Sequence, residues 1–128
     1  MKRIAAVILS LFVLAGCFGG ESEKDIGYKQ VNAEQAMEIM ANESDYIILD
    51  VRTEEEYAQA HIPNAICIPN ETISDEKPKQ LEDFDQLILV YCRSGNRSKQ
   101  AAEKLVNIGY TNIVEFGGIN DWHGEIEK

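Results

Sequence analysis

The chain has 128 residues, 45% of them hydrophobic, and a formal net charge of -10. This length predicts one folded domain, and the excess of acidic residues argues against binding to nucleic acid or to an anionic membrane surface. The two histidines and three cysteines lack the spacing of a zinc site, so we expect no metal and no cofactor.

The first 16 residues have the pattern of a secretory signal peptide. Lys2 and Arg3 precede a mostly apolar run over 4–15, which is shorter than the about 20 residues that a membrane-spanning helix needs. The run ends in Leu-Ala-Gly-Cys, which resembles the lipobox of bacterial lipoproteins. The resemblance implies that residues 1–16 are removed and that Cys17 receives acyl chains such as palmitate. An ordinary secretory peptide or a short uncut anchor is the alternative.

A polar segment separates this cysteine from the folded part. Residues 17–28 are small and charged and show no periodicity, which predicts a flexible tether. Lipid on Cys17 would then be the only membrane contact of a domain over 29–128, held at the extracytoplasmic face of a bacterial cell membrane. We expect this domain to be a monomer.

The folded part alternates strand-like and helix-like segments. Apolar and β-branched residues predict strands at 28–31, 46–51, 65–69, 87–91 and 112–116. Helical spacing predicts helices at 33–42, 54–60 and 97–109, with one helical turn near 78–83 and a short helix after 117. This alternation predicts an α/β fold with a central parallel sheet of about five strands and helices on both faces.

Helix ends are marked in the sequence. Asn32 followed by Gln35, and Thr53 followed by Glu56, are capping-box patterns at two predicted helix starts. Gly109 follows the last apolar residue of the third predicted helix and is expected to end it.

The polar loops that follow two of the strands indicate where the site lies. In open parallel sheets, ligands bind beyond the carboxyl ends of the strands. The loops at 50–52 and 92–97 both leave strands at that end, and we expect them to reach one crevice.

The second of these loops places a thiol at the start of a helix. Cys92 follows a buried strand, and the helix after it offers backbone N–H groups that favour an anion. Gly95 lets the loop turn, while Arg93, Arg97 and Lys99 add positive charge. Such surroundings suit a thiolate and an anionic substrate. An inert buried cysteine with solvent-facing arginines is the alternative.

Three motifs in order resemble the rhodanese family. The segment "LDVRTEEEYAQAHIPNAICIP" resembles the family's Asp-x-Arg and His-Ile-Pro-x-Ala signatures, "VYCRSGNRSKQAA" its active-site strand, loop and helix, and "IGYTNIVEFGGINDW" its closing strand and Gly-Gly-x-x-x-Trp. The resemblance covers about residues 30–125. It implies the rhodanese fold and a sulfurtransferase that moves sulfane sulfur from a small anion such as thiosulfate to a thiol, cyanide or protein acceptor.

The resemblance also assigns roles to residues. Cys92 would carry the persulfide, and the surrounding loop would hold the sulfur through Arg93, Ser94, Gly95, Asn96 and Arg97. Asp50 and Arg52 would form a structural ion pair, and His61 would be structural as well. We expect His123 to be solvated and Trp122 to cover the core.

Two other functions use a similar loop. Cysteine-based phosphatases and arsenate reductases carry Cys, five residues and Arg, whereas four residues separate Cys92 from Arg97 here. A sulfur carrier or thiol sensor without enzymatic turnover needs the same loop as an enzyme. Cys67 lies between Ile66 and Ile68, so we expect it to be buried in the core and not bonded to Cys92.

Overall fold

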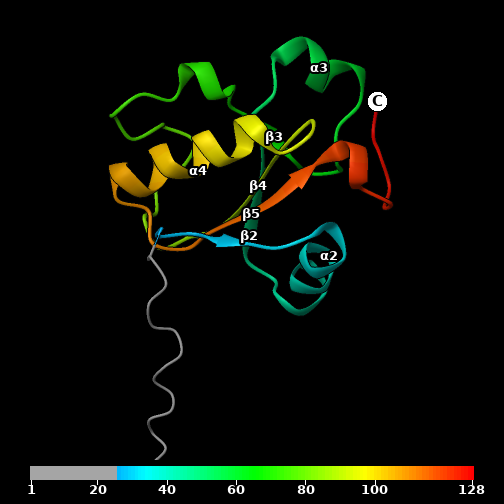
Figure 1. Ribbon diagram of the computed structural model, residues 1–128, viewed down its shortest axis with the longest axis horizontal. Coiled ribbons are helices and arrows are strands. Elements are labelled where there is room, and N and C mark those ends of the chain that lie inside the picture. Colours follow the sequence, from blue (N-terminus) through cyan, green and yellow to red (C-terminus); the bar gives the residue numbers. More distant parts are fainter. Residues whose placement is uncertain (1–25) are drawn as a thin grey trace, which may run out of the picture.

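The computed structural model describes residues 26–128, which form a five-stranded parallel sheet with helices on both faces (Figure 1). The signal peptide predicted at 1–16 and Cys17 lie outside the described residues. The sheet has the order β1-β5-β4-β2-β3. Its strands are β1 (Lys29–Gln30), β2 (Tyr46–Asp50), β3 (Ile66–Cys67), β4 (Leu87–Cys92) and β5 (Ile113–Gly118).

The three α-helices within residues 26–128 occupy different places around the sheet. They are α2 (Ala33–Asn42), α3 (Glu54–Gln59) and α4 (Asn96–Ile108). In Figure 1, α2 lies on one side of the sheet, α4 lies on the other, and α3 stands near the amino-terminal end of α4. The predicted fold class is therefore confirmed.

Each face of the sheet buries its own apolar cluster. Residues of β4 alternate between the two clusters, so that Ile88, Val90 and Cys92 face α4 while Leu89 and Tyr91 face α2. The side chain of Cys92 therefore lies on the same side of the sheet as α4.

Helix ends follow the predicted signals. Both capping boxes form, with Asn32 and Thr53 each accepting from the backbone of the residue three positions on. Gly109 ends α4 with a φ of 131°, a conformation that favours glycine. Since these signals act within one helical turn, they are readable from the sequence alone.

One of the two short helical segments was predicted wrongly. Residues 78–83 form turns, one of them closed by the Leu81 N–H donating to the Pro78 carbonyl at 3.1 Å, and no helix. The single 3₁₀ turn of this region lies earlier, at η1 (Asn70–Thr72). The short helix predicted after residue 117 is a 3₁₀ helix, η2 (Ile119–Asp121). Within residues 26–128, no helix is both long and apolar enough to cross a membrane.

Candidate active site

Cys92 is the last residue of β4, and its side chain is buried against the start of α4. The N–H of Gly95 donates to Sγ at 3.0 Å. Gly95 has a φ of 109° and precedes the first residue of α4 without any side-chain cap of its own. No side chain caps this helix, and the thiol sulfur accepts the Ser98 N–H, at the third helical position, that a cap would otherwise bind.

The pKa of the Cys92 thiol results from two opposing causes. Burial raises it, but hydrogen bonding with the Ser98 side chain and with the N–H groups of Ser98, Gly95 and Ser94 outweighs burial, so the pKa lies below its usual value. The sequence predicted this direction but attributed it to arginines as well as amides. In the structure the hydrogen bonds of the loop and of the first helical turn are the cause.

Ser98 and Glu115 form a buried chain of polar groups behind the thiol. Ser98 Oγ lies 3.5 Å from Cys92 Sγ and 2.5 Å from Oε2 of Glu115. The same carboxylate oxygen accepts the N–H of Gly117 at 2.9 Å. Both side chains are almost fully buried, with 0% of Ser98 and 2% of Glu115 exposed.

A bulge in β5 brings this carboxylate and the loop together. Val90 pairs with Glu115, but Cys92 pairs with Gly118, so β5 contains one residue more than β4 over this stretch. Gly117 sits in the bulge with a φ of 91°. A Cβ on Gly118 would lie 2.0 Å from the Arg93 carbonyl oxygen, so only glycine allows the Cys92 loop to pack this closely on β5.

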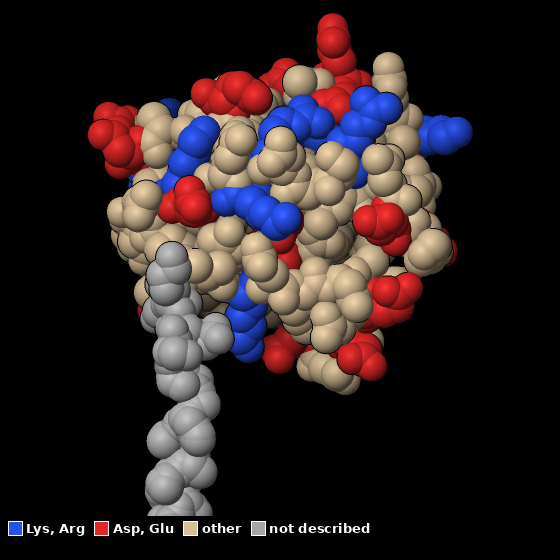
Figure 2. Space-filling view, viewed as in Figure 1, with Lys and Arg blue, Asp and Glu red and all other residues tan. Residues whose placement is uncertain are grey.

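The two loop arginines have different surroundings. Arg97 donates to both carboxylate oxygens of Glu56, at 2.9 and 3.2 Å, whereas Arg93 is exposed. Figure 2 shows Lys and Arg side chains gathered over the α4 side of the molecule. Ser94 and Asn96 are exposed beside Arg93, so the mouth of the loop is polar.

Asp50 and Arg52 form the buried ion pair that the resemblance implied. Their closest atoms are 2.7 Å apart, and the Arg52 guanidinium also donates to the Ala60 carbonyl at 2.6 Å. The Tyr91 hydroxyl donates to Asp50 at 2.7 Å and accepts the N–H of Ile62 at 3.1 Å. Since Tyr91 precedes Cys92, the pair fixes the end of β4 from the α2 side of the sheet.

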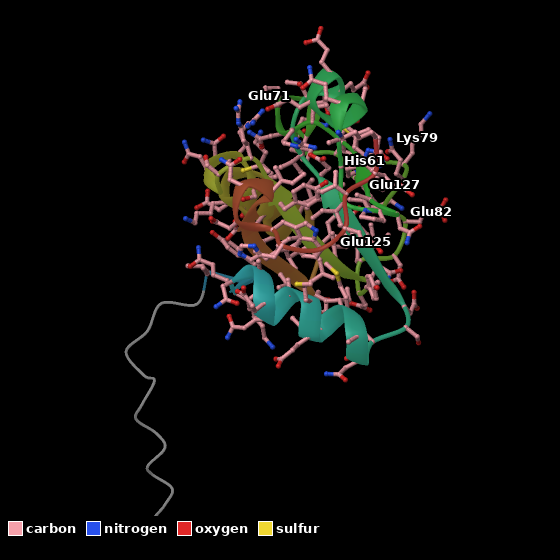
Figure 3. All side chains as sticks on the ribbon, turned by 90° about the vertical axis from the view of Figure 1, so that its right-hand side faces the viewer. His61, Glu71, Lys79, Glu82, Glu125 and Glu127 are labelled. Atoms are coloured by element: carbon pink, nitrogen blue, oxygen red, sulfur yellow. The ribbon has the colours of Figure 1, made fainter. Side chains whose placement is uncertain are left out.

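The histidines lie away from the thiol. The ring of His61 stacks on Tyr57 with 3.8 Å between centroids, and its Nε2 lies 3.2 Å from a carboxylate oxygen of Glu127. Figure 3 shows His61 beside Glu127 of the C-terminal segment. His123 is 74% exposed, as expected. In residues 26–128, no three His, Cys, Asp or Glu side chains are grouped to hold a metal ion.

Trp122 and Cys67 were predicted to belong to the core. Trp122 packs on Phe116 with 5.8 Å between ring centroids, which confirms its covering role. Cys67 is a free thiol that is only half-buried, so its prediction as a fully buried residue was wrong. β3 is a two-residue strand at the edge of the sheet, which leaves the Cys67 thiol partly uncovered beside the 50–53 loop, 3.6 Å from the Arg52 carbonyl oxygen.

The sequence reasoning did not include Ser98, Glu115 or Tyr91 in the site. Ser98 lies one residue beyond the loop that was singled out. Glu115 left a signal, since it is a charged residue inside an otherwise apolar strand. Tyr91 looked like an ordinary strand residue, and only the register of β2 beside β4 shows its contact with Asp50.

Comparison with known proteins agrees with this geometry. The family model of the rhodanese-like domain matches residues 32–125, which include strands β4 and β5 and the Cys92 loop. The chain belongs to the rhodanese-like domain family. The family resemblance stated from the sequence is thereby confirmed.

Several curated relatives of the chain are sulfurtransferases by name. The adenylyltransferase and sulfurtransferase UBA4 of Meyerozyma guilliermondii is 33% identical over 66% of this chain and 22% of its own length, so the chain spans about a fifth of that relative. The thiosulfate sulfurtransferase PspE of Escherichia coli is 37% identical over 57% of this chain and 70% of its own. A sulfurtransferase of Allochromatium vinosum is 35% identical over 74% of this chain and 90% of its own length.

Solved rhodanese structures share the fold. A rhodanese-like domain protein from Staphylococcus aureus is 31% identical and covers 77% of this chain and 96% of its own, with a TM-score of 0.67. A rhodanese with anions from E. coli is 34% identical over 65% of this chain and 98% of its own length, with a TM-score of 0.60.

Proposed function

We propose that the chain is a sulfurtransferase that carries sulfane sulfur as a persulfide on Cys92. The observation that carries this proposal is the contrast between the two thiols of the described chain. Hydrogen bonds lower the pKa of Cys92, while burial and nearby Asp50 raise the pKa of Cys67 to about 11. Only Cys92 is therefore prepared to act as a thiolate near neutral pH.

The transfer is a displacement at sulfur. With thiosulfate as donor, the Cys92 thiolate attacks the sulfane sulfur, and a new S–S bond forms as the old S–S bond breaks. The bonding pair leaves with sulfite, and the negative charge passes to the terminal sulfur of the persulfide. An acceptor thiolate or cyanide then attacks that sulfur and regenerates the Cys92 thiolate.

The loop supports both the donor and the persulfide. Backbone N–H groups of Ser94, Gly95 and Ser98 point at the Cys92 sulfur, where they favour negative charge. Arg93 is exposed at the mouth and attracts an anionic donor, an effect that weakens as salt screens it. The name of the E. coli relative supports thiosulfate as the donor.

Intact-mass analysis of the full chain tests this function. After incubation with thiosulfate, the chain should gain the mass of one sulfur atom, and cyanide should remove that sulfur while thiocyanate forms. Cys92→Ser should gain no labile sulfur, whereas Cys67→Ser should load like the wild type. Loading of Cys92→Ser, or no loading of the wild type by thiosulfate or polysulfide, would overturn the assignment.

Turnover separates an enzyme from a carrier. Multiple turnovers with cyanide or a small thiol indicate an enzyme, whereas loading without release to small acceptors indicates a carrier for a protein partner. Incubation with phosphate esters and arsenate covers the phosphatase and reductase alternatives. Efficient turnover of either by the wild type contradicts sulfur transfer as the main activity.

We also propose that the domain is held at the extracytoplasmic face of a bacterial membrane by lipid on Cys17. The support is the Leu-Ala-Gly-Cys ending of the apolar run. Expressed in bacteria, the full chain should partition into the detergent phase, and Cys17→Ala should stay unprocessed. Equal processing and equal partitioning of the two chains would contradict this proposal.

A further inference from the structure

Arg97 lies near the thiol, but its charge is already paired. Its guanidinium donates through Nη1 to Oε1 of Glu56 at 2.9 Å and through Nη2 to Oε2 at 3.2 Å. This two-point geometry is the strong form of an arginine–carboxylate contact. Arg97 is close enough to Cys92 for the charge of the thiolate to act on it. An anion that approaches Cys92 therefore meets an arginine that already holds another anion.

Glu56 is fixed in this position from its own helix. Its Oε1 also accepts the N–H of Thr53 at 2.9 Å, as part of the capping box of α3. Hydrogen bonding to Arg97 is the main cause that lowers the pKa of Glu56 to about 2, so this carboxylate is charged at neutral pH. Because the cap holds the carboxylate on α3, an anionic donor has to compete with it for Arg97.

The other charged groups around the loop do not replace this arginine. Arg93 and Lys99 are exposed, and neither belongs to any of the ion pairs found within residues 26–128. Glu71 of η1 is a second acid whose charge acts on Arg97. The attraction of an anionic donor is therefore left to Arg93, Lys99 and the backbone N–H groups of the loop.

We propose that Glu56, by neutralising Arg97, determines how strongly the site at Cys92 prefers a doubly charged sulfur donor. With the ion pair intact, the site gains little from the second negative charge of a dianion such as thiosulfate. Singly charged sulfane donors, such as organic persulfides and thiosulfonates, are then accepted alongside it. Glu56 does not touch the donor, so it is a specificity-determining residue that acts through Arg97. This inference rests on the proposed function of Cys92.

Two donors of similar shape separate the effect of charge from other effects. Methanethiosulfonate has a methyl group where thiosulfate has a charged oxygen, so it is a monoanion. In both reactions the Cys92 thiolate attacks the sulfane sulfur, and a new S–S bond forms as the S–S bond of the donor breaks. The electron pair leaves with sulfite or with methanesulfinate. The ratio of the two second-order rate constants of loading therefore cancels any change in the thiol or the loop that affects both donors equally.

The net charge of the pair predicts the order of four proteins. Glu56→Gln keeps the cap but leaves the charge of Arg97 unneutralised. The ratio of thiosulfate to methanethiosulfonate loading should then rise about three- to tenfold, the size expected from one added charge acting on one extra donor charge in a partly solvated site. Arg97→Gln leaves Glu56 as an unpaired acid, so its ratio should fall below that of the wild type. The double variant restores the original net charge and should return to the ratio of the wild type.

A neighbouring acid provides the matched control. Glu55→Gln removes an exposed acid of the same helix that belongs to none of the ion pairs within residues 26–128, and its ratio should match that of the wild type. The rise in Glu56→Gln should shrink as added salt screens the new charge. If Glu56→Gln fails to fold, the fall expected for Arg97→Gln decides the question.

Alkylation of the full chain measures the same charge without a sulfur donor. Iodoacetate and iodoacetamide both react with a thiolate by displacing iodide, but only iodoacetate is an anion. Peptide mass analysis separates Cys92 from Cys17 and Cys67. The ratio of iodoacetate to iodoacetamide rates at Cys92 should rise in Glu56→Gln and fall in Arg97→Gln.

Two outcomes would overturn the inference: an unchanged loading ratio in a folded Glu56→Gln protein, or a rise that survives in the double variant. The first would mean that the carboxylate does not affect the choice of donor, and the second that Arg97 is not the group it neutralises. If neither donor loads the wild type, the proposed function fails, whereas the alkylation ratios still decide whether Glu56 sets the preference for anions at Cys92. The two proposals therefore fail separately.

Discussion

Arg97 and Glu56 join two segments that are distant in the sequence, with hydrogen bonds of 2.9 and 3.2 Å between the guanidinium and the carboxylate. Glu56 belongs to α3, which follows the Asp50–Arg52 loop, and Arg97 belongs to the first turn of α4. The ion pair therefore ties together the two loops that leave β2 and β4. It also occupies the arginine that the sequence assigned to binding the sulfur.

This pair should make the protein sensitive to acid. Hydrogen bonding to Arg97 lowers the pKa of Glu56 to about 2, below its unfolded value of about 4.5. A lowered folded-state pKa stabilises the protein at any pH above the unfolded value, and this stabilisation is lost as pH falls from about 4.5 to about 2. Glu56→Gln should lower the free energy of unfolding by about 1–2 kcal/mol at neutral pH, since both side chains are partly open to solvent.

Urea unfolding at a series of pH values tests this prediction. Gln keeps the capping box with Thr53, so the substitution removes the ion pair but keeps the cap. Glu55→Gln, an exposed acid of the same helix, is the matched control and should keep the steep loss of stability below pH 4.5. If the free energy of unfolding falls equally with pH in Glu56→Gln and in the wild type, the ion pair does not contribute to stability.

The two glycines at the end of β5 should differ in their tolerance of a methyl group. A Cβ on Gly118 would meet backbone atoms, 2.0 Å from the Arg93 carbonyl oxygen and 2.5 Å from the Ser94 nitrogen. Gly117 has open space but a φ of 91°, which costs about 1–2 kcal/mol for a residue with a Cβ. Gly118→Ala should therefore displace the loop and abolish sulfur loading by thiosulfate.

Gly117→Ala is the control for this comparison. It should unfold at a lower temperature than wild type and still load sulfur. Loading by mass spectrometry and thermal unfolding separate the two effects. Normal loading of Gly118→Ala would mean that the loop can shift away from β5 without losing its function.

The sequence predicted what depends on local pattern. The capping boxes at Asn32 and Thr53 and the stop at Gly109 act within a few residues, and all three formed. The parallel sheet followed from the alternation of strands and helices. The Cys92 loop was found because the charge and glycine pattern lies in one continuous segment.

Contacts between segments could not be predicted in the same way. Glu115 meets Ser98 only because β5 packs against the start of α4, and the bulge that follows Glu115 brings the Gly117 N–H to the same carboxylate. Tyr91 meets Asp50 because these two residues are paired across β2 and β4. Arg97 looked free to bind an anion, since the sequence does not show that α3 brings Glu56 beside it.

Cys67 should contribute to stability and not to sulfur transfer. It is half-buried, and its thiol lies 3.6 Å from the Arg52 carbonyl. Cys67→Ala should lower the free energy of unfolding by about 1 kcal/mol, because only part of the side chain is removed from water. Sulfur loading should match wild type. Loss of loading with unchanged stability would place Cys67 in the reaction.

The hydroxyl of Tyr91 should stabilise the fold in addition to the packing of its ring. Its hydroxyl donates to Asp50 at 2.7 Å and accepts the N–H of Ile62 at 3.1 Å, and all three groups are buried. Tyr91→Phe keeps the ring against Phe116 and under the Arg52 guanidinium but leaves the Ile62 N–H without this partner. We expect it to lower the free energy of unfolding by about 1–3 kcal/mol.

The same substitution should reach the active site through the backbone, because Tyr91 is bonded to Cys92. A loosened end of β4 should slow sulfur loading, because Cys92 is the last residue of this strand. Tyr46→Phe is the matched control, because Tyr46 begins β2 at the far end of the sheet and is only half-buried. Urea unfolding and loading by mass spectrometry measure both effects. A cost for Tyr91→Phe no larger than that for Tyr46→Phe would mean that the buried network adds nothing beyond ring packing.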